Sequence, residues 1–127
     1  GQYTAPIKKA LGPLYGKALG FWLADSYEAD AQNFTDDLLS EFKARRGYDP
    51  TPYLPALAGR VVGSAELSDR FLWDYRRTLA DLLAERHYGA IADLAHRDGL
   101  RVYSEAAGIS MPVIQDALLN KSHVDIP

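Results

Sequence analysis

The feature that most constrains the fold of this chain is a short apolar run that ends abruptly in acidic residues. The segment from Leu19 to Asp30 reads LGFWLADSYEAD. An apolar run of this length followed by polar residues is typical of a buried strand that ends where the chain meets solvent. A second run of the same kind, LRVYSE, spans Leu100–Glu105 and is followed by three small residues. The two runs predict two buried strands, each followed closely by a glutamate.

Strands that end in acidic residues place carboxylates where α/β folds bind their ligands. In α/β barrels and open α/β sheets, the residues just past the carboxyl ends of the strands face the ligand. Glu28 and Glu105 are therefore expected to converge on one cleft. Glycoside hydrolysis needs such a pair, with the carboxyl groups ~6.5–9.5 Å apart in inverting enzymes and ~5–5.5 Å apart in retaining ones. The alternative is that both glutamates are solvated loop residues.

Within this first run, Glu28 is the candidate general acid. A carboxylic acid that is partly buried or lies beside a like charge can supply a proton near neutral pH. Asp25, three positions earlier, would supply the like charge, and Tyr27 would supply part of an apolar surround. Asp25, Glu28 and Asp30 could instead bind a hard cation such as calcium, although their spacing matches no EF-hand loop.

Composition narrows the class of protein. The chain has 127 residues, 47% of them hydrophobic and 24% charged, which indicates one modest globular domain. Its net charge of −3 argues against a nucleic-acid partner. Having no cysteine, it has neither disulfides nor thiolate metal sites. No apolar run approaches the ~20 residues of a membrane span, and no signal-peptide pattern opens the chain. We expect a piece of a longer protein, since the chain starts at Gly1 and ends at Pro127 without a stop signal.

Helical patterns alternate with the two strands. The expected order is a helix over 4–17 broken at Gly12–Pro13, a strand over 19–24, a helix from Asn33 or Thr35 to Gly47, an irregular loop over 48–63, a long helix from Ser64 or Ser68, a further helix through 91–95 to Gly99, a strand over 100–105 and a short helix over 111–119. With helices between them, the strands should be parallel. Both carboxyl groups should then lie on the same face of the sheet, within about 12 Å of each other.

The charged and aromatic residues of the long helix can be explained by ion pairing and core packing alone. Its arginines, at positions 70, 76, 77 and 86, are interleaved with acids, which favours pairs four residues apart on an exposed face. A role for Arg70 or Arg76 in orienting carboxylates is the alternative. Phe71, Trp73 and Tyr75 are expected in the core. The histidines show no metal-binding spacing, and His87 and His96 are expected at helix ends.

Four motifs together carry a resemblance to a known family. They are DSYE at Asp25–Glu28, EFK…RGYD at Glu41–Asp49, PYLPALAGR at Pro52–Arg60 and DRFLWDYR at Asp69–Arg76. From about Ala18 to Ile126, the chain resembles the α-L-rhamnosidases of glycoside hydrolase family 106. The resemblance implies that residues 1–127 are a fragment of a catalytic (β/α)8 barrel domain in a large multidomain enzyme. It implies inverting hydrolysis of terminal α-L-rhamnosides, assisted by a bound calcium ion.

The resemblance also implies roles for particular residues. The strand-end motif of the family is usually Asp-Ser-Trp-Glu, so Glu28 corresponds to the general acid, while Tyr27 stands where tryptophan is commoner and lacks the indole N–H. The general base and some metal ligands are expected beyond Pro127, which leaves Glu105 as a further catalytic candidate. Asp25, Tyr27, Tyr53 and Arg60 are the candidate substrate-binding residues, and Asp25 is the candidate calcium ligand.

The expected fold class is therefore α/β, a partial (β/α)8 TIM-type barrel with parallel strands and flanking helices. The expected partners are a rhamnose-containing glycan and the rest of the parent polypeptide, with no nucleic acid and no membrane. We expect the isolated chain to be inactive. Localisation stays open, with the periplasm or the outside of the cell as candidates for the full-length parent. Two alternatives remain, a barrel glycosidase for another sugar and a non-catalytic helical interaction module.

Overall fold

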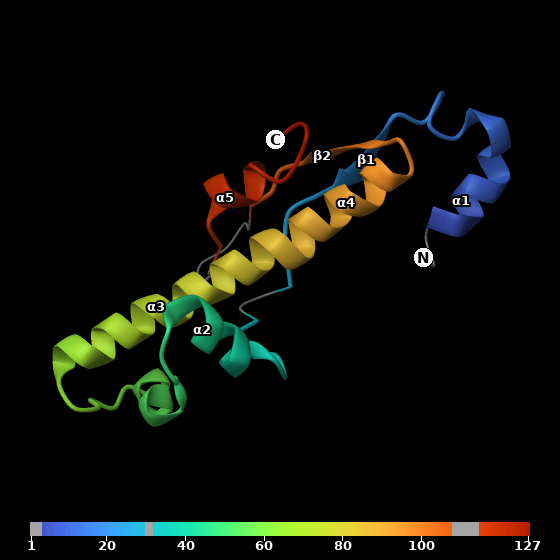
Figure 1. The fold of residues 1–127 in the computed structure, drawn as a ribbon. Helices are drawn as coiled ribbons and strands as arrows, with labels where there is room; N and C mark the ends of the chain where they lie inside the picture. The colour runs from blue at the N-terminus through green and yellow to red at the C-terminus, as the bar shows by residue number, and fades with distance from the viewer. Residues whose placement is uncertain (1–3, 30–31, 108–114) are drawn as a thin grey trace.

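A long helix with parallel strands along one end and a smaller helical group at the other organises the chain (Figure 1). The computed structural model describes residues 4–29, 32–107 and 115–127. The elements are α1 (Thr4–Leu11), η1 (Gly12–Leu14), β1 (Phe21–Ala24), α2 (Leu38–Arg46), η2 (Thr51–Ala58), α3 (Ala65–Leu83), η3 (Ala84–Gly89), α4 (Ala90–Arg97), β2 (Arg101–Ser104) and α5 (Ala117–Lys121). The architecture is mixed α/β.

The sheet confirms the predicted parallel strands. β1 pairs with β2 in parallel, with Phe21 opposite Arg101 and Ala24 opposite Ser104. On the other side of β2, the last residues of the chain continue the sheet. The Ile126 N–H donates to the Val102 carbonyl at 3.1 Å, and the Ser104 N–H donates to the Ile126 carbonyl at 3.0 Å. The residues that the structure describes form this open parallel sheet and not a closed barrel.

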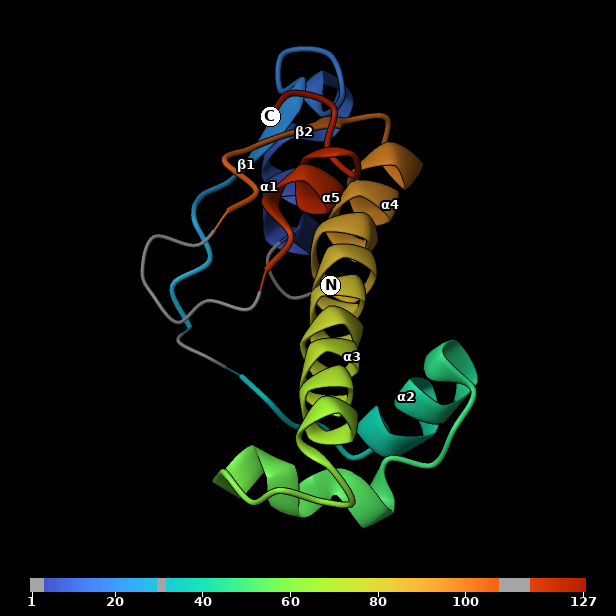
Figure 2. The ribbon, with the colours of Figure 1, turned by 90° about the vertical axis from the view of Figure 1, so that its left-hand side faces the viewer.

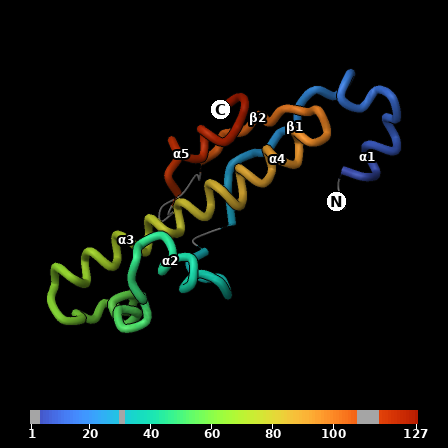
Figure 3. The backbone as a smooth tube through the Cα atoms, viewed as in Figure 1, coloured from blue at the N-terminus to red at the C-terminus, as the bar shows by residue number. Residues whose placement is uncertain are grey.

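The long helix differs from the prediction, which divided it into two. α3, η3 and α4 form one continuous rod (Figure 3). A helix from Ala65 to Arg97 is about 50 Å long. Ser64 is the cap, because its Oγ accepts a hydrogen bond from the Leu67 N–H at 3.1 Å. η3 is a π-helical turn, so the apolar pattern shifts there without the chain leaving the helix.

One apolar core lies at the start of the long helix. α2 buries Leu38 and Phe42 completely, and Phe42 packs against Phe71 and Tyr75 of α3. Gly47 ends α2 in the left-handed conformation with a φ of 84°, as predicted. Asp37, rather than the predicted Asn33 or Thr35, occupies the position before its first residue. The core therefore joins α2 to α3.

Residues 48–63 are more regular than predicted. A 3₁₀ helix, η2, spans Thr51–Ala58 and ends at Gly59, whose φ is 77°. Pro52 stands at the start of η2, where a missing N–H needs no partner, and Pro55 stands inside the segment. Tyr53 of η2 stacks on Phe71 of α3 with ring centroids 5.7 Å apart. The loop thus closes the first core.

A second core lies between α4 and the sheet. Ala92 and Ala95 of α4 pack against Leu100 and Val102, which are almost fully buried. The opposite face of the sheet stays open, since Leu23 is 66% exposed and Tyr103 46% exposed. Figure 2 shows the strands at one end of the long helix and α2 at the other. One helix therefore links two separate cores.

The last predicted helix begins later than expected. Residues 111–114 lie outside the described part of the chain, and α5 begins at Ala117. Asp116 caps it, because its Oδ1 accepts a hydrogen bond from the Leu119 N–H at 3.0 Å. Among the helices that the structure describes, none is long and apolar enough to cross a membrane.

Removal of the Phe42 ring tests the first core. Phe42→Ala leaves a cavity among rings that have no room to collapse, which costs about 3–5 kcal/mol. That is a large share of the stability of a small domain. We expect the isolated chain to lose its cooperative urea transition, measured by circular dichroism. Leu118→Ala, at a site that is 83% exposed, is the control and should leave the transition in place.

The pH dependence of folding tests the contact between β2 and the end of the chain. Asp125 Oδ2 accepts hydrogen bonds from the Val102 N–H at 2.7 Å and from His96 Nε2 at 2.9 Å. These bonds hold the pKa of the Asp125 carboxyl below its ordinary value of 3.8. The Val102 N–H has the larger effect and His96 the smaller. A lowered pKa contributes stability above the unfolded value that is lost as pH falls through the folded value.

We therefore expect the urea midpoint of the chain to fall as pH drops below about 4. Asp125→Asn should lower the midpoint at pH 6 and make the acid side of the profile flatter. Asp69→Asn, at an exposed carboxylate of α3, is the matched control and should leave the profile in place. An Asp125→Asn profile parallel to that of the parent sequence would contradict this role.

Candidate functional site

The carboxyl ends of β1 and β2 bring two acidic segments together. Ala24 and Ser104 are paired in the sheet, so the next residues, Asp25 and Glu105, leave it at the same level. Beyond the sheet the two segments stay side by side, because the Tyr27 N–H donates to the Ala107 carbonyl at 2.9 Å. The expectation that both segments open at one edge of the sheet is confirmed. The ~12 Å limit on the Glu28–Glu105 carboxyl separation stays a prediction.

A local network holds the turn after β1. The Ser26 N–H donates to Asp25 Oδ1 at 2.9 Å, and Ser26 Oγ donates to Glu28 Oε1 at 2.8 Å. Ser26 therefore ties both carboxylates into one turn. Asp25 and Glu28 are exposed within this chain. Of the rings expected to surround Glu28, Trp22 and Tyr27 are half-buried and Phe21 is exposed.

Glu105 leaves β2 on the open side of the sheet. Val102 and Ser104 are buried against the helices, and the alternating residues Tyr103 and Glu105 are exposed. Side chains alternate between the two faces of a strand. Glu105 is therefore on the face away from α4, where Leu23 of β1 is also exposed.

Ala106 is a feature of this edge that the sequence analysis missed. Its φ is 50°, which puts a buried alanine in the left-handed region. Non-glycine residues in this region are strained and cluster at functional sites. The Ala106 N–H donates to Ser104 Oγ at 3.1 Å, which holds the turn directly after Glu105.

Tyr27 lies in the turn after β1, and its ring contacts the long helix. Its ring meets the His87 imidazole edge to face, with centroids 5.4 Å apart and an interplanar angle of 82°. Burial lowers the pKa of His87 below its ordinary value of 6.5. His87 belongs to η3, between α3 and α4. It therefore lies in the middle of the long helix, and not at a helix end as predicted.

Tyr53 and Arg60 lie away from the strand ends. Residues 51–58 pack at the start of α3, at the opposite end of the long helix from the sheet (Figure 1). There Tyr53 lines a cavity of about 230 Å³ with Tyr48, Leu67 and Arg70. The Tyr48 hydroxyl donates to Asp74 Oδ2 at 2.9 Å, and burial, with that bond, raises its pKa. Arg60 is exposed beyond η2. The structure does not bring these residues to Glu28.

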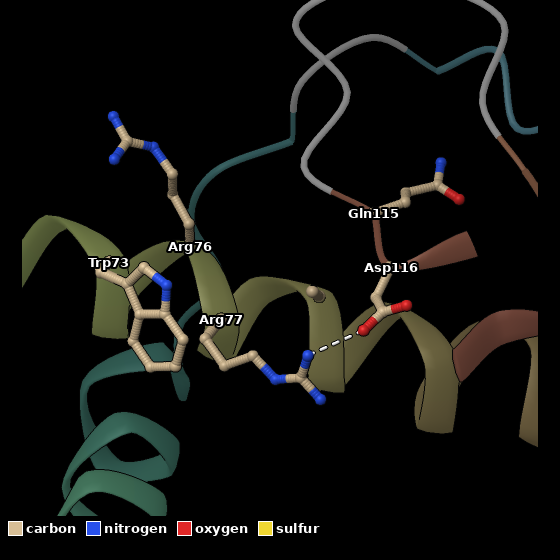
Figure 4. Close-up of a pocket in the computed structure, with 6 residues that line it drawn as sticks. Trp73, Arg76, Arg77, Gln115 and Asp116 are labelled. Carbon is tan, nitrogen blue, oxygen red and sulfur yellow. Dashed lines mark hydrogen bonds and ion pairs between the residues drawn. The ribbon is translucent and has the colours of Figure 1, made fainter. Parts of the chain in front are cut away.

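A separate hollow of about 290 Å³ lies between α3 and the residues before α5 (Figure 4). The Arg77 guanidinium crosses it to Asp116 Oδ2 at 2.7 Å and also bonds Asp81. Trp73, expected in the core, is 63% exposed at its rim. Its indole stands on the solvent side of α3, whereas Phe71 and Tyr75 are buried as predicted.

The predicted calcium site is not assembled by this part of the chain. In the three described ranges, no group of three or more acidic or histidine side chains could hold a metal ion. Asp30, one of the candidate ligands, lies outside those ranges. Asp25 offers a carboxylate at the strand end, and its Oδ1 accepts the Ser26 N–H. The residues present therefore do not fit calcium by themselves.

Comparison with known proteins places this geometry in a family. The family model for α-L-rhamnosidase, glycoside hydrolase family 106, matches residues 1–127. The structure of a rhamnosidase from Novosphingobium sp. PP1Y matches 99% of this chain with a TM-score of 0.86 and 46% sequence identity. A Formosa agariphila protein, provisionally named a beta-glucuronidase, is 46% identical over 96 residues, or 76% of this chain.

The chain spans 12% of the rhamnosidase chain and 8% of the Formosa agariphila protein. It is therefore a fragment in relation to these relatives. Because the family model covers the chain from end to end, the chain belongs to the α-L-rhamnosidase family, glycoside hydrolase family 106.

Proposed function

We propose that the parent of this chain hydrolyses terminal α-L-rhamnosides, with acid–base chemistry at the carboxyl edge of the β1–β2 sheet. One observation carries the proposal. The segments of Glu28 and Glu105 leave parallel strands at the same level and remain hydrogen-bonded through Tyr27 and Ala107. Paired carboxylates at such an edge are what glycoside hydrolysis requires.

In this mechanism Glu28 is the general acid. Its carboxyl group gives a proton to the glycosidic oxygen as the bond from that oxygen to the anomeric carbon breaks. A water molecule attacks the anomeric carbon from the opposite face and gives its proton to a carboxylate base, so the configuration inverts. Glu105 is the base that this chain offers, and a carboxylate of the parent beyond Pro127 is the alternative. Asp25 would accept hydrogen bonds from sugar hydroxyls, and Tyr27 would wall the site.

The surrounding fold that we propose is a (β/α)8 barrel. Helix α4 lies along one side of the sheet (Figure 1), and the open side carries Leu23, Tyr103 and Glu105. In a barrel, helices cover the outside and the other face of each strand points inward. The backbone pairing of Ile126 with β2 supports a third parallel strand in the same sheet. Calcium would then need ligands from the rest of the parent, with Asp25 as a candidate donor from this chain.

A Glu28→Gln variant of the full-length parent tests the acid. We expect kcat to fall at least ~10²-fold on a rhamnoside with a poor leaving group, because an amide is too weak an acid to protonate the glycosidic oxygen. The loss should be smaller on an aryl rhamnoside, whose leaving group needs less protonation. Glu66→Gln, at an exposed carboxylate in the first turn of α3, is the control. Equal and small losses on both substrates would remove Glu28 from the role.

Hydrolysis of another sugar is the second candidate, because the Formosa agariphila relative is provisionally named a beta-glucuronidase. A screen of aryl glycosides against the parent separates the two. Turnover of the α-L-rhamnoside is expected, and activity confined to the β-glucuronide would replace our proposal with the second candidate. An interaction module without catalysis would turn over neither substrate.

The isolated 127-residue chain should show no glycosidase activity and should self-associate. A closed barrel takes roughly 200 residues or more, and the open face of the sheet leaves Phe21, Leu23 and Tyr103 exposed. Sedimentation and an aryl-rhamnoside assay on the purified chain provide the measurements. Robust turnover by this chain would overturn the view that the site needs the rest of the parent.

A further inference from the structure

The π-helical turn η3 interrupts the long helix at the level of the strand ends. A π turn holds one residue more than an α-helical turn, so its side chains point in directions that an α helix would not allow. Such turns are often found at functional sites. In this chain, Glu85 and Arg86 of η3 bond side chains of α2 and of the residue before it, whereas His87 contacts Tyr27 after β1.

The contacts of η3 reach most of the fold. Glu85 receives two hydrogen bonds from Arg45 of α2, the shorter at 2.6 Å. Arg86 pairs with Asp37 and Glu41. These pairs cross between helices, and so they differ from the predicted pairs within the long helix. These ion pairs, all with α2 or with Asp37 just before it, therefore tie η3 to α2.

His87 is the residue of η3 that faces the candidate site. It is half-buried, and its ring contacts the face or edge of two tyrosines, Tyr27 at 5.4 Å and Tyr88 at 4.8 Å between centroids. Tyr88 is only 1% exposed and gives the imidazole a rigid backing. Tyr27, by contrast, belongs to the turn that carries Glu28. His87 thus joins a fixed part of the core to the catalytic turn.

Tyr27 is held at two points. Its backbone N–H bonds the Ala107 carbonyl of the β2 segment, and its ring rests on His87. The backbone bond joins the turn after β1 to the segment after β2. The ring contact joins the same turn to the long helix. Glu28 follows directly in the chain, so a displacement of the Tyr27 backbone would move its carboxyl group.

We infer that His87 is a positioning residue, whose imidazole edge fixes the Tyr27 ring and thereby the placement of the Glu28 carboxyl group. The inference rests on the proposed function for its effect on catalysis, and on geometry alone for its effect on the turn. Burial of His87 supports it, since a lowered pKa keeps the ring neutral near pH 7 and suited to aromatic packing. Nothing in this role requires His87 to touch the sugar.

The test uses three variants of the full-length parent. His87→Ala removes the ring, His87→Phe keeps an aromatic edge without the ring nitrogens, and His96→Ala is the matched control on the same helix, where His96 bonds Asp125. Two readouts are measured for each: kcat and KM on an aryl rhamnoside, and hydrogen exchange of a peptide covering residues 25–29.

For His87→Ala we expect kcat to fall by about tenfold to a hundredfold with little change in KM, because the acid is displaced and binding is kept. Exchange of the 25–29 peptide should be faster. His87→Phe should recover most of both losses, and His96→Ala should change neither. In a Tyr27→Ala background, His87→Ala should add little, since the two residues act through one contact.

Three results would overturn the inference. The first is parent-like kcat and exchange in His87→Ala, and the second is a His87→Phe variant as impaired as His87→Ala. The third is full additivity of the His87 and Tyr27 losses. If His87→Ala does not fold, His87→Phe and the Tyr27 variant still decide the matter. If the parent hydrolyses no rhamnoside, the proposed function fails, and the exchange of residues 25–29 still tests the role of His87.

Discussion

The parallel pairing of β1 with β2 is the constraint on which the rest of the fold depends. Parallel neighbours need a connection that carries the chain back along the sheet before the second strand begins. Here the long helix from Ala65 to Arg97 makes that return. Its length of about 50 Å is several times the ~13 Å of a four-residue strand. Only α4 is needed to cover the strands, so the first part of the helix extends past their carboxyl ends, on the side of the candidate site.

The two cores that this helix joins have different requirements. The first core needs α3 to present Phe71 and Tyr75 to α2, and the second needs α4 to present Ala92 and Ala95 to the sheet. A straight α helix has a single rotational phase along its length. The π turn η3 changes that phase between the two cores, and it buries Tyr88 at the point of change. Because the helix changes its rotational phase at η3, His87 is turned toward Tyr27.

The local elements of the fold could be predicted from the sequence. Glycine ended α2, a serine began α3, and two apolar runs became parallel strands. The π turn could not be predicted, because its signal is a shift of a single residue in an apolar pattern that also fits two separate helices. The 3₁₀ helix η2 could not be predicted, because its prolines are equally typical of irregular loops.

The candidate site divided in the same way. The level of Asp25 and Glu105 follows from strand ends that can be read in the sequence. The positions of Tyr53 and Arg60 depend instead on where the segment over residues 48–63 packs. No local sequence pattern predicts that position. Trp73 was expected in the core because aromatic residues usually are, yet the helix presents it to solvent. The left-handed Ala106 is a property of backbone geometry, and alanine gives it no signal.

The distance along the chain between the two strands has a consequence for synthesis on the ribosome. Phe21 and Arg101, which pair in the sheet, are about 80 positions apart. The contacts of α2 and η2 with α3 are far more local, and local contacts form faster because they close shorter loops. We expect the helical core to form while β2 is still being synthesised. During that interval the edge of β1 that pairs with β2 is open, which makes this stretch of the nascent parent a natural target for chaperones.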